Sequence, residues 1–204
     1  TDLNYDTEET GVVIQIDDGG SLTIQTGPLA VKSFISVFTF TGASGDETSY
    51  PPDLQPSNLT IGSIERGANL FPQTLSDAFN ARNWTTTSSA TDQYYYQFTI
   101  DADAGYTFDI TSIELDHRRS GTGPISWEVR SSVDGYTADI GGFFSTPAED
   151  TWYTNQEVEF GTAIQGESSV SIRLYAYNSG GGLGTWAIDN LKIYGTATDI
   201  QAPS

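Results

Sequence analysis

The sequence predicts an all-β fold, a two-sheet antiparallel β-sandwich of the jelly-roll type. Three observations predict it. Short runs of β-branched and aromatic residues recur about every eight to fifteen residues, which is typical of such sandwiches. Gly, Asp, Asn or Pro residues separate the runs and supply turns. No stretch of useful length has the apolar spacing of an amphipathic helix.

The first elements in chain order are strands at residues 11–16 and 21–25, joined by the hairpin sequence Asp-Asp-Gly-Gly at 17–20. Residues 31–40 alternate as a third strand. Residues 41–89 are rich in Ser, Thr, Asn and Pro, which predicts long loops with short strands. Cap signals at Ser76 and Asp77 predict one helical turn at residues 75–80.

The second half alternates more regularly, with Gly- and Asp-containing turns between the strands. It predicts six strands, at residues 94–100, 112–118, 126–131, 157–160, 170–177 and 186–194. The two ends of the chain resemble linkers. We therefore divide the chain into an extra hairpin or linker edge at 1–30, a jelly-roll module at 31–195 and a linker at 196–204.

Composition excludes several functions. The 204 residues include 27 acidic and 8 basic side chains, for a net charge of −19, which opposes binding to nucleic acid or to an anionic membrane surface. The absence of cysteine excludes disulfides and thiolate chemistry. The apolar runs are too short to insert into a membrane as a helix. The acidity favours a secreted or cell-surface protein.

Alternation along the strands also assigns the two faces of each sheet. The inward set includes Trp127 and Val129. The outward set combines charged and aromatic residues, and planar rings with Arg and carboxylate groups are the usual means of recognising sugars. If the strands are neighbours, these residues form one face: Tyr95, Glu114, Asp116, Arg118, Glu128, Arg130, Arg173, Tyr175 and Tyr177, with Arg119 beside them.

A structural interpretation stands beside the binding one, because cross-strand Arg–carboxylate pairs stabilise many sheets. Trp84 and Trp152 lie in irregular stretches, where either ligand stacking or burial is open to them. Trp127 is expected in the core.

Catalytic patterns are incomplete. His117 is the single histidine and lies on the core side of its strand, where a buried structural role is more frequent than catalysis. Glu114-Leu-Asp116 matches the start of a Glu-x-Asp-x-x-Glu hydrolase strand, but Arg119 occupies the place of the last Glu. We expect no enzyme activity.

Calcium is the metal that an oxygen-rich, thiol-free chain would bind. Asp189 interrupts the alternation of the last strand, and Asp46 and Glu47 are candidate partners. The alternative for Asp189 is a bulge or a solvent-facing side chain.

Several segments together resemble a carbohydrate-binding-module-like jelly-roll domain of secreted bacterial proteins. They include residues 79–86, 105–113, 116–124 and 127–136, and the closing Trp-Ala-Ile-Asp-Asn-Leu at 186–191. Such domains occur in modular extracellular proteins of cyanobacteria, planctomycetes and marine bacteria. The resemblance implies a structural Ca²⁺ held by Asp189 and backbone carbonyls, with the first-strand ligand falling to Thr41 or a carbonyl.

The main hypothesis is a non-catalytic module that binds a polysaccharide or another glycan and adjoins neighbouring domains of a parent chain. An extracellular adhesion or spacer module that contacts protein is the alternative. A polysaccharide lyase or hydrolase ranks third.

Overall fold

The computed structural model describes the backbone of residues 10–16, 22–28 and 32–201, and the side chains of residues 32–201. The chain divides into two compact units, of which the second begins at Ser33. In the first unit, β1 (Thr10–Ile16) pairs antiparallel with β2 (Leu22–Pro28), with Ile14 opposite Ile24. The predicted turn at 17–20 lies outside the described residues.

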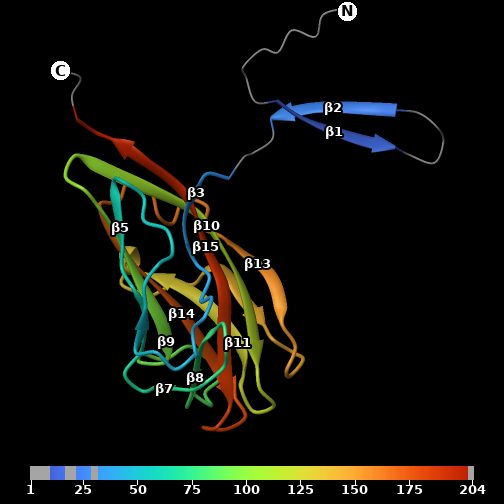
Figure 1. Ribbon diagram of the computed structural model, residues 1–204, viewed down its shortest axis with the longest axis vertical. Helices are drawn as coiled ribbons and strands as arrows, with labels where there is room; N and C mark the ends of the chain where they lie inside the picture. Colours follow the sequence, from blue (N-terminus) through green and yellow to red (C-terminus); the bar gives the residue numbers. More distant parts are fainter. Residues whose placement is uncertain (1–9, 17–21, 29–31, 202–204) are drawn as a thin grey trace, which may run out of the picture. The chain divides into compact units, whose positions relative to one another are not determined.

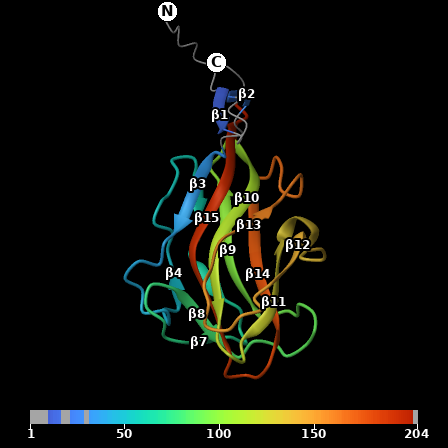
Figure 2. The same cartoon turned by 90° about the vertical axis from the view of Figure 1, so that its right-hand side faces the viewer.

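The second unit is the predicted β-sandwich of two antiparallel sheets (Figures 1 and 2). One sheet has six strands in the order β13 (Tyr153–Glu159), β10 (Tyr106–Arg119), β15 (Thr185–Asp199), β8 (Phe79–Arg82) and β7 (Phe71–Pro72), with β3 (Phe34–Phe38) also on β15. The other has seven strands in the order β12 (Ile140–Ser145), β11 (Pro124–Ser131), β14 (Ser169–Ser179), β9 (Tyr95–Ala102), β6 (Ile64–Arg66) and β4 (Ser49–Tyr50), with β5 (Leu59–Ile61) also on β9. The fold class predicted from the sequence is confirmed.

The core fills the space between the two sheets. Along each strand, residues that point into this space alternate with polar residues that point outward. Its centre is aromatic. Trp186 stacks on Tyr96 at a centroid distance of 5.5 Å, and Trp84 meets both rings edge-on. The Tyr96 hydroxyl donates a 2.6 Å hydrogen bond to the Trp186 carbonyl, which ties the two sheets together. Trp127 is fully buried, as the sequence predicted.

Two sequence expectations about local structure are wrong. The predicted helical turn at 75–80 is a loop that leads into β8, because the amides of Leu75 and Asp77 bond to the carbonyls of Ser44 and Ala43 in another segment. The predicted linker at 196–204 begins as strand, since β15 continues to Asp199 and pairs there with the start of β10. The one helical element in the described part is a short 3₁₀ turn, η1 (Ser132–Asp134).

Candidate functional site

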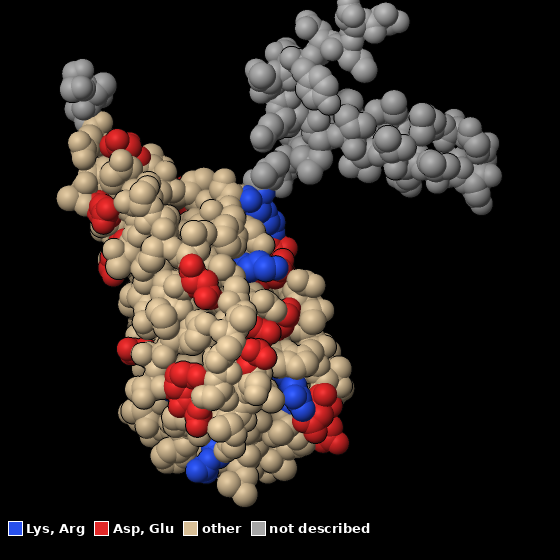
Figure 3. Space-filling model, viewed as in Figure 1, with Lys and Arg blue, Asp and Glu red and all other residues tan. Residues whose placement is uncertain are grey.

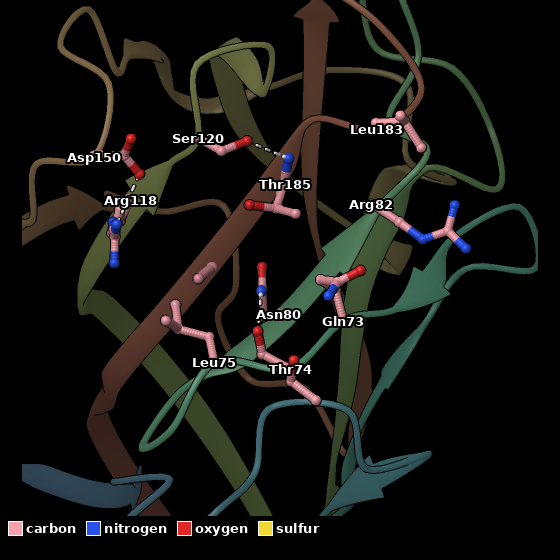
Figure 4. A pocket seen from close by; sticks show the side chains of 11 residues that line it. Gln73, Thr74, Leu75, Asn80, Arg82, Arg118, Ser120, Asp150, Leu183 and Thr185 are labelled. Carbon is pink, nitrogen blue, oxygen red and sulfur yellow. Dashed lines mark hydrogen bonds and ion pairs between the residues drawn. The ribbon is translucent and has the colours of Figure 1, made fainter.

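An open pocket lies on the outer face of the six-stranded sheet, where β8, β15 and β10 run side by side (Figure 4). Its volume is about 620 Å³. Most of the side chains that line it are polar, and two leucines lie at its border. The lining residues are Gln73, Thr74, Leu75, Asn80, Arg82, Arg118, Ser120, Asp150, Leu183, Thr185 and Ala187.

Strand parity places these side chains on the outer face. Trp186 of β15 is buried in the core, so its neighbours Thr185 and Ala187 point to the other side of the sheet. Ala187 is in register with Arg118 of β10, and Thr185 is in register with Arg82 of β8. The period of two in the sequence therefore brings side chains from three strands to one surface.

The floor of the pocket is fixed from behind by Arg66. Its guanidinium group is stacked over Phe79 at 3.7 Å and donates hydrogen bonds to the carbonyls of Gly45, Glu47 and Asn80. The amide of Asn80 in turn donates to the Gly45 carbonyl. A partly buried cation thus binds the 44–47 loop to β8, and holds Asn80 in place beneath the pocket.

The upper rim is a packed pair of loops. The hydroxyl of Ser120 accepts a 2.8 Å hydrogen bond from the amide of Thr185. Gly184 passes so close to the carbonyl of Thr122 that a Cβ atom would overlap it, which requires glycine there. Leu183 is 78% exposed beside this contact. Figure 4 labels its side chain at the edge of the pocket.

The two arginines of the pocket differ in their partners. Arg118 forms an ion pair of 2.7 Å with Asp150, whose side chain is 62% exposed. Arg82 has no carboxylate partner among the described residues, and its guanidinium group lies 5.3 Å from the centre of the Phe71 ring. The pocket therefore offers guanidinium, amide and hydroxyl groups beside apolar carbon, which suits a polyhydroxylated ligand.

Other outward residues from the predicted face lie on the seven-stranded sheet, so the expectation of one shared face is wrong. Glu114, Asp116 and Arg118 are on β10 of the six-stranded sheet, whereas the others are on β9, β11 and β14. The sandwich separates them because the strands that carry them belong to different sheets. The residues on the seven-stranded sheet are Tyr95, Glu128, Arg130, Arg173, Tyr175 and Tyr177.

The residues of this second group form hydrogen bonds and ring contacts with one another. Arg173 lies between the rings of Tyr95 and Tyr136, at 4.1 and 3.7 Å, and donates to Gln97 and to the hydroxyl of Tyr175. In the same manner Arg130 is paired with Glu128, whose other oxygen accepts a hydrogen bond from Tyr177. We name this group of residues (95, 128, 130, 136, 173, 175 and 177) the tyrosine–arginine ladder.

Two of the three tyrosines predicted to stack on a sugar are buried, and the third, Tyr95, is partly exposed with the Arg173 guanidinium 4.1 Å from its ring centre. Tyr175 is 2% exposed and Tyr177 is 7% exposed, so their predicted solvent exposure is wrong. Burial and the adjacent Glu128 carboxylate raise the pKa of Tyr177 to about 12. Long side chains on adjacent strands have covered one another, which a count of alternating positions cannot reveal.

The remaining predicted residues lie in three different settings. Arg119 is buried, and its guanidinium donates to the carbonyls of Ser120, Gly121, Thr146 and Pro147, so its predicted place on a binding surface is wrong. Trp84 is 2% exposed and donates to the Ala81 carbonyl, which excludes stacking on a ligand. Trp152 is partly exposed, as ligand stacking would need.

Similarity to known proteins is found among solved structures. No protein-family model matches the sequence, and no curated protein matches it. The chain is similar to an arabinose-bound α-L-arabinofuranosidase, with 12% identity over 88% of this chain and 27% of that one, at a TM-score of 0.44. It is also similar to the xylohexaose complex of the CBM22-1–GH10 modules of a Clostridium thermocellum xylanase, with 11% identity over 85% of this chain and 30% of that one, at 0.39.

A third similar structure is the N-terminal cellulose-binding domain of Cellulomonas fimi β-1,4-glucanase C, with 12% identity over 79% of this chain and all of that one, at a TM-score of 0.37. The chain thus spans less than a third of the length of the first two proteins. Because all three TM-scores are below 0.5, none of these similarities assigns a function to this chain.

The predicted calcium ligands are not assembled around a shared centre of carboxylates. Within residues 32–201, no three His, Cys, Asp or Glu side chains are placed to hold a metal ion. The Asp46 carboxylate accepts a hydrogen bond from Ser44, and the Thr41 carbonyl is 3.5 Å from the Tyr50 hydroxyl. Ligation would rest on Asp189, at most one other carboxylate and neutral oxygens, and calcium stays a prediction.

Asp189 lies in an acidic environment. It is opposite Asp116 in the β10–β15 register, and Asn190 donates hydrogen bonds to both carboxylates. Burial, with the Asp116 and Asp77 carboxylates nearby, raises the pKa of Asp189 to about 6. Asn190 has a positive φ of 49°, so the interruption predicted from the sequence is a real break in the strand pattern.

The residues considered for hydrolysis are committed to other contacts. Glu114 forms a 2.6 Å ion pair with Lys192, and Asp116 accepts hydrogen bonds from the amide of Asn155 and from Asn190. His117 is fully buried and lies within hydrogen-bond distance of Thr146, 3.1 Å away. Burial lowers the pKa of His117 to about 4. None of these three residues lines the pocket described above.

No helix of the described residues is long and apolar enough to span a lipid bilayer.

Proposed function

We propose that the β-sandwich of this chain is a non-catalytic carbohydrate-binding module, and that it holds a polysaccharide in the pocket on the outer face of the six-stranded sheet. The observation that supports this proposal is the pocket itself. It combines side-chain donors and acceptors from three strands with two leucines, on a floor held rigid by Arg66. A preformed polar surface binds a flexible ligand without first having to become ordered.

Each kind of group has a role. Arg82 and Arg118 donate to ligand oxygens. Asn80 is buried beneath them and donates to the Thr74 carbonyl, so it supports the floor of the pocket. Leu75 and Leu183 contact the apolar C–H surfaces that every pyranose ring exposes. An open pocket on a sheet admits an internal stretch of a long chain, whereas a closed cavity would select chain ends or monosaccharides.

Retention on glycans is the direct test. We expect the protein to be retarded in affinity gels that contain its polysaccharide, and a Thr185→Phe variant, which fills the pocket, to lose at least about tenfold in affinity. Thr111→Phe is the matched control, because Thr111 is an exposed position of the same sheet outside the pocket.

Two results would refute the proposal. The first is no binding across a broad glycan panel that includes neutral and acidic polymers, with calcium present. The second is equal binding by wild type and Thr185→Phe when both proteins are folded. Release of reducing ends or unsaturated products from any glycan would refute the non-catalytic part. Capture of a defined protein partner through the same surface would favour the adhesion alternative.

We also propose that the parent protein is secreted or displayed at the cell surface. The strong acidity supports this, because it favours solubility and low affinity for nucleic acids. Fractionation of the source cells, with immunodetection of the chain, tests the proposal.

A further inference from the structure

We propose that the ligand of this pocket is an acidic glycan, and that Arg82 and Arg118 contact two separate carboxylate or sulfate groups along one chain. This inference rests on the function proposed above and names the class of polysaccharide. Two observations carry it: which arginines of the protein retain unused hydrogen-bond donors, and where those arginines lie on the sheet.

In four of the six arginines, the guanidinium group is bonded to other groups of the protein. Arg66 and Arg119 each donate to at least three backbone carbonyls. Arg130 and Arg173 belong to the tyrosine–arginine ladder, where each has a side-chain partner and an aromatic neighbour. Removing any of them from its partners would break several hydrogen bonds at once.

Arg82 and Arg118 are different. The guanidinium group of Arg82 carries five donors but makes no hydrogen bond or ion pair with the described residues. Arg118 has a single partner, the exposed carboxylate of Asp150 on the loop before β13. An ion pair with so exposed a carboxylate contributes little to stability, so a ligand anion can replace it at little cost.

Both arginines line the same pocket, on opposite sides of β15. Arg118 extends from β10, and Arg82 from β8, with Thr185 and Ala187 between them (Figure 4). Neighbouring strands are about 4.8 Å apart, and the β15 partners of the two arginines, Ala187 and Thr185, are two residues or about 7 Å apart along the strand, so the two backbone positions are separated by about 12 Å. That separation suits two acidic groups on a glycan chain better than one.

The net charge of −19 does not forbid an anionic ligand. The Debye length is about 8 Å at physiological ionic strength, so distant carboxylates are largely screened and the nearest charges decide the interaction. On the face shown in Figure 3, Lys and Arg side chains are few and stand apart among scattered Asp and Glu. Bidentate hydrogen bonds from guanidinium to carboxylate or sulfate are also stronger than those to a hydroxyl.

The first experiment compares each acidic polymer with an uncharged polymer of the same backbone. Binding is measured by affinity gel and calorimetry for polygalacturonate against its fully methyl-esterified form, and for dextran sulfate against dextran. We expect at least about tenfold tighter binding to the acidic member of one pair, and the pair in question shows whether carboxylate or sulfate is recognised.

The second experiment changes the protein. Arg82→Gln and Arg118→Gln should each weaken acidic binding by about tenfold, and Asp150→Asn should strengthen it severalfold, since the competing carboxylate is removed. Lys192→Gln and Asp139→Asn are the charge-matched controls. Lys192 is on the same sheet but outside the pocket, and Asp139 is an exposed carboxylate before β12.

The outcomes separate the two proposals. Equal binding of the acidic and neutral members, or a control variant that changes affinity as much as the pocket variants, overturns the acidic glycan and leaves the carbohydrate-binding function in place. Failure to bind any of the polymers, together with a negative glycan panel, overturns both. Weaker binding by Asp150→Asn also overturns the acidic ligand, because it shows that the carboxylate contacts a hydroxyl.

Discussion

His117 should make the stability of this protein fall as the pH is lowered from neutral. The imidazole is fully buried, stacks on Tyr153 at 5.3 Å and meets Trp127 edge-on at 5.0 Å. Its one hydrogen-bond partner is the hydroxyl of Thr146, and Nε2 has none among the described residues. Desolvation of the imidazolium form lowers the pKa to about 4, only partly opposed by the Asp116 carboxylate.

Linkage between protonation and folding sets the sign of the effect. The unfolded chain binds a proton at His117 near pH 6.5 and the folded chain only near pH 4, so protonation favours the unfolded state between these values. The stability contributed by the neutral ring is complete above about pH 7.5 and declines as the pH falls. The loss attributable to His117 is about 1.3 kcal/mol between about pH 7.5 and 5.5, and approaches about 3 kcal/mol near pH 4.

Urea unfolding of wild type and of His117→Asn, each at about pH 7.5 and at about pH 5.5, measures this loss of stability. The asparagine amide can keep the hydrogen bond to Thr146 but does not titrate. Groups common to both proteins cancel in the difference, including Asp189, whose raised pKa makes it contribute with the opposite sign. We expect the gap in unfolding free energy between wild type and variant to narrow by about 1.3 kcal/mol from about pH 7.5 to 5.5.

A gap that stays constant over this range would refute the reasoning, because it would mean that the folded protein accepts the proton as readily as the unfolded one. A His117 pKa near 6.5 in an NMR titration of the folded protein would refute it independently.

Four other predictions rest on individual contacts. Arg66→Met should lower the free energy of unfolding by about 2 kcal/mol, because several carbonyls lose a partly buried charged donor; urea unfolding measures it, and an unchanged midpoint contradicts it. Gly184→Ala should cost more than about 2 kcal/mol, since its Cβ overlaps a backbone carbonyl, whereas Gly181→Ala, which has free space, should change stability by less than about 0.5 kcal/mol. Arg173→Gln should destabilise the fold by about 1–2 kcal/mol yet leave glycan affinity unchanged; a selective loss of affinity would restore the ladder as a binding face. If calcium is bound, a chelator lowers the melting temperature and Asp189→Ala removes that sensitivity, whereas an identical melt with and without chelator rejects the ion.

Much of the fold could be predicted from the sequence because a strand in a sandwich has a local signature. Alternation of apolar and polar residues depends only on one face being buried, and it marked most of the long strands of the second half. Where alternation is short, prediction failed. Residues 75–80 have helix cap signals, but their amides found acceptors in a loop far earlier along the chain, as the Leu75–Ser44 hydrogen bond shows.

The candidate site was predicted only in part. Arg118 was identified from its outward position, but Arg82, Asn80 and Asp150 were not, because they lie in a short strand and a loop without clear periodicity. The sequence Phe-Asn-Ala-Arg at 79–82 does alternate once its strand is known, with Phe79 and Ala81 buried in the core. The alternation was therefore present in the sequence, but over a strand of 4 residues it cannot be distinguished from a chance pattern.

The sequence by itself determined the class of fold, the composition of the core and the exclusion of thiol chemistry, since these depend on residue types and local periodicity. Only the tertiary structure decided which outward residues share a surface. The alternation of residues along a strand shows that a side chain points away from the core, but not which of the two sheets contains that strand. The sandwich places Arg118 on one sheet and the tyrosine–arginine ladder on the other. Pairing is likewise a three-dimensional property: four arginines find enough partners within the protein, and Arg82 and Arg118 keep donors for a ligand.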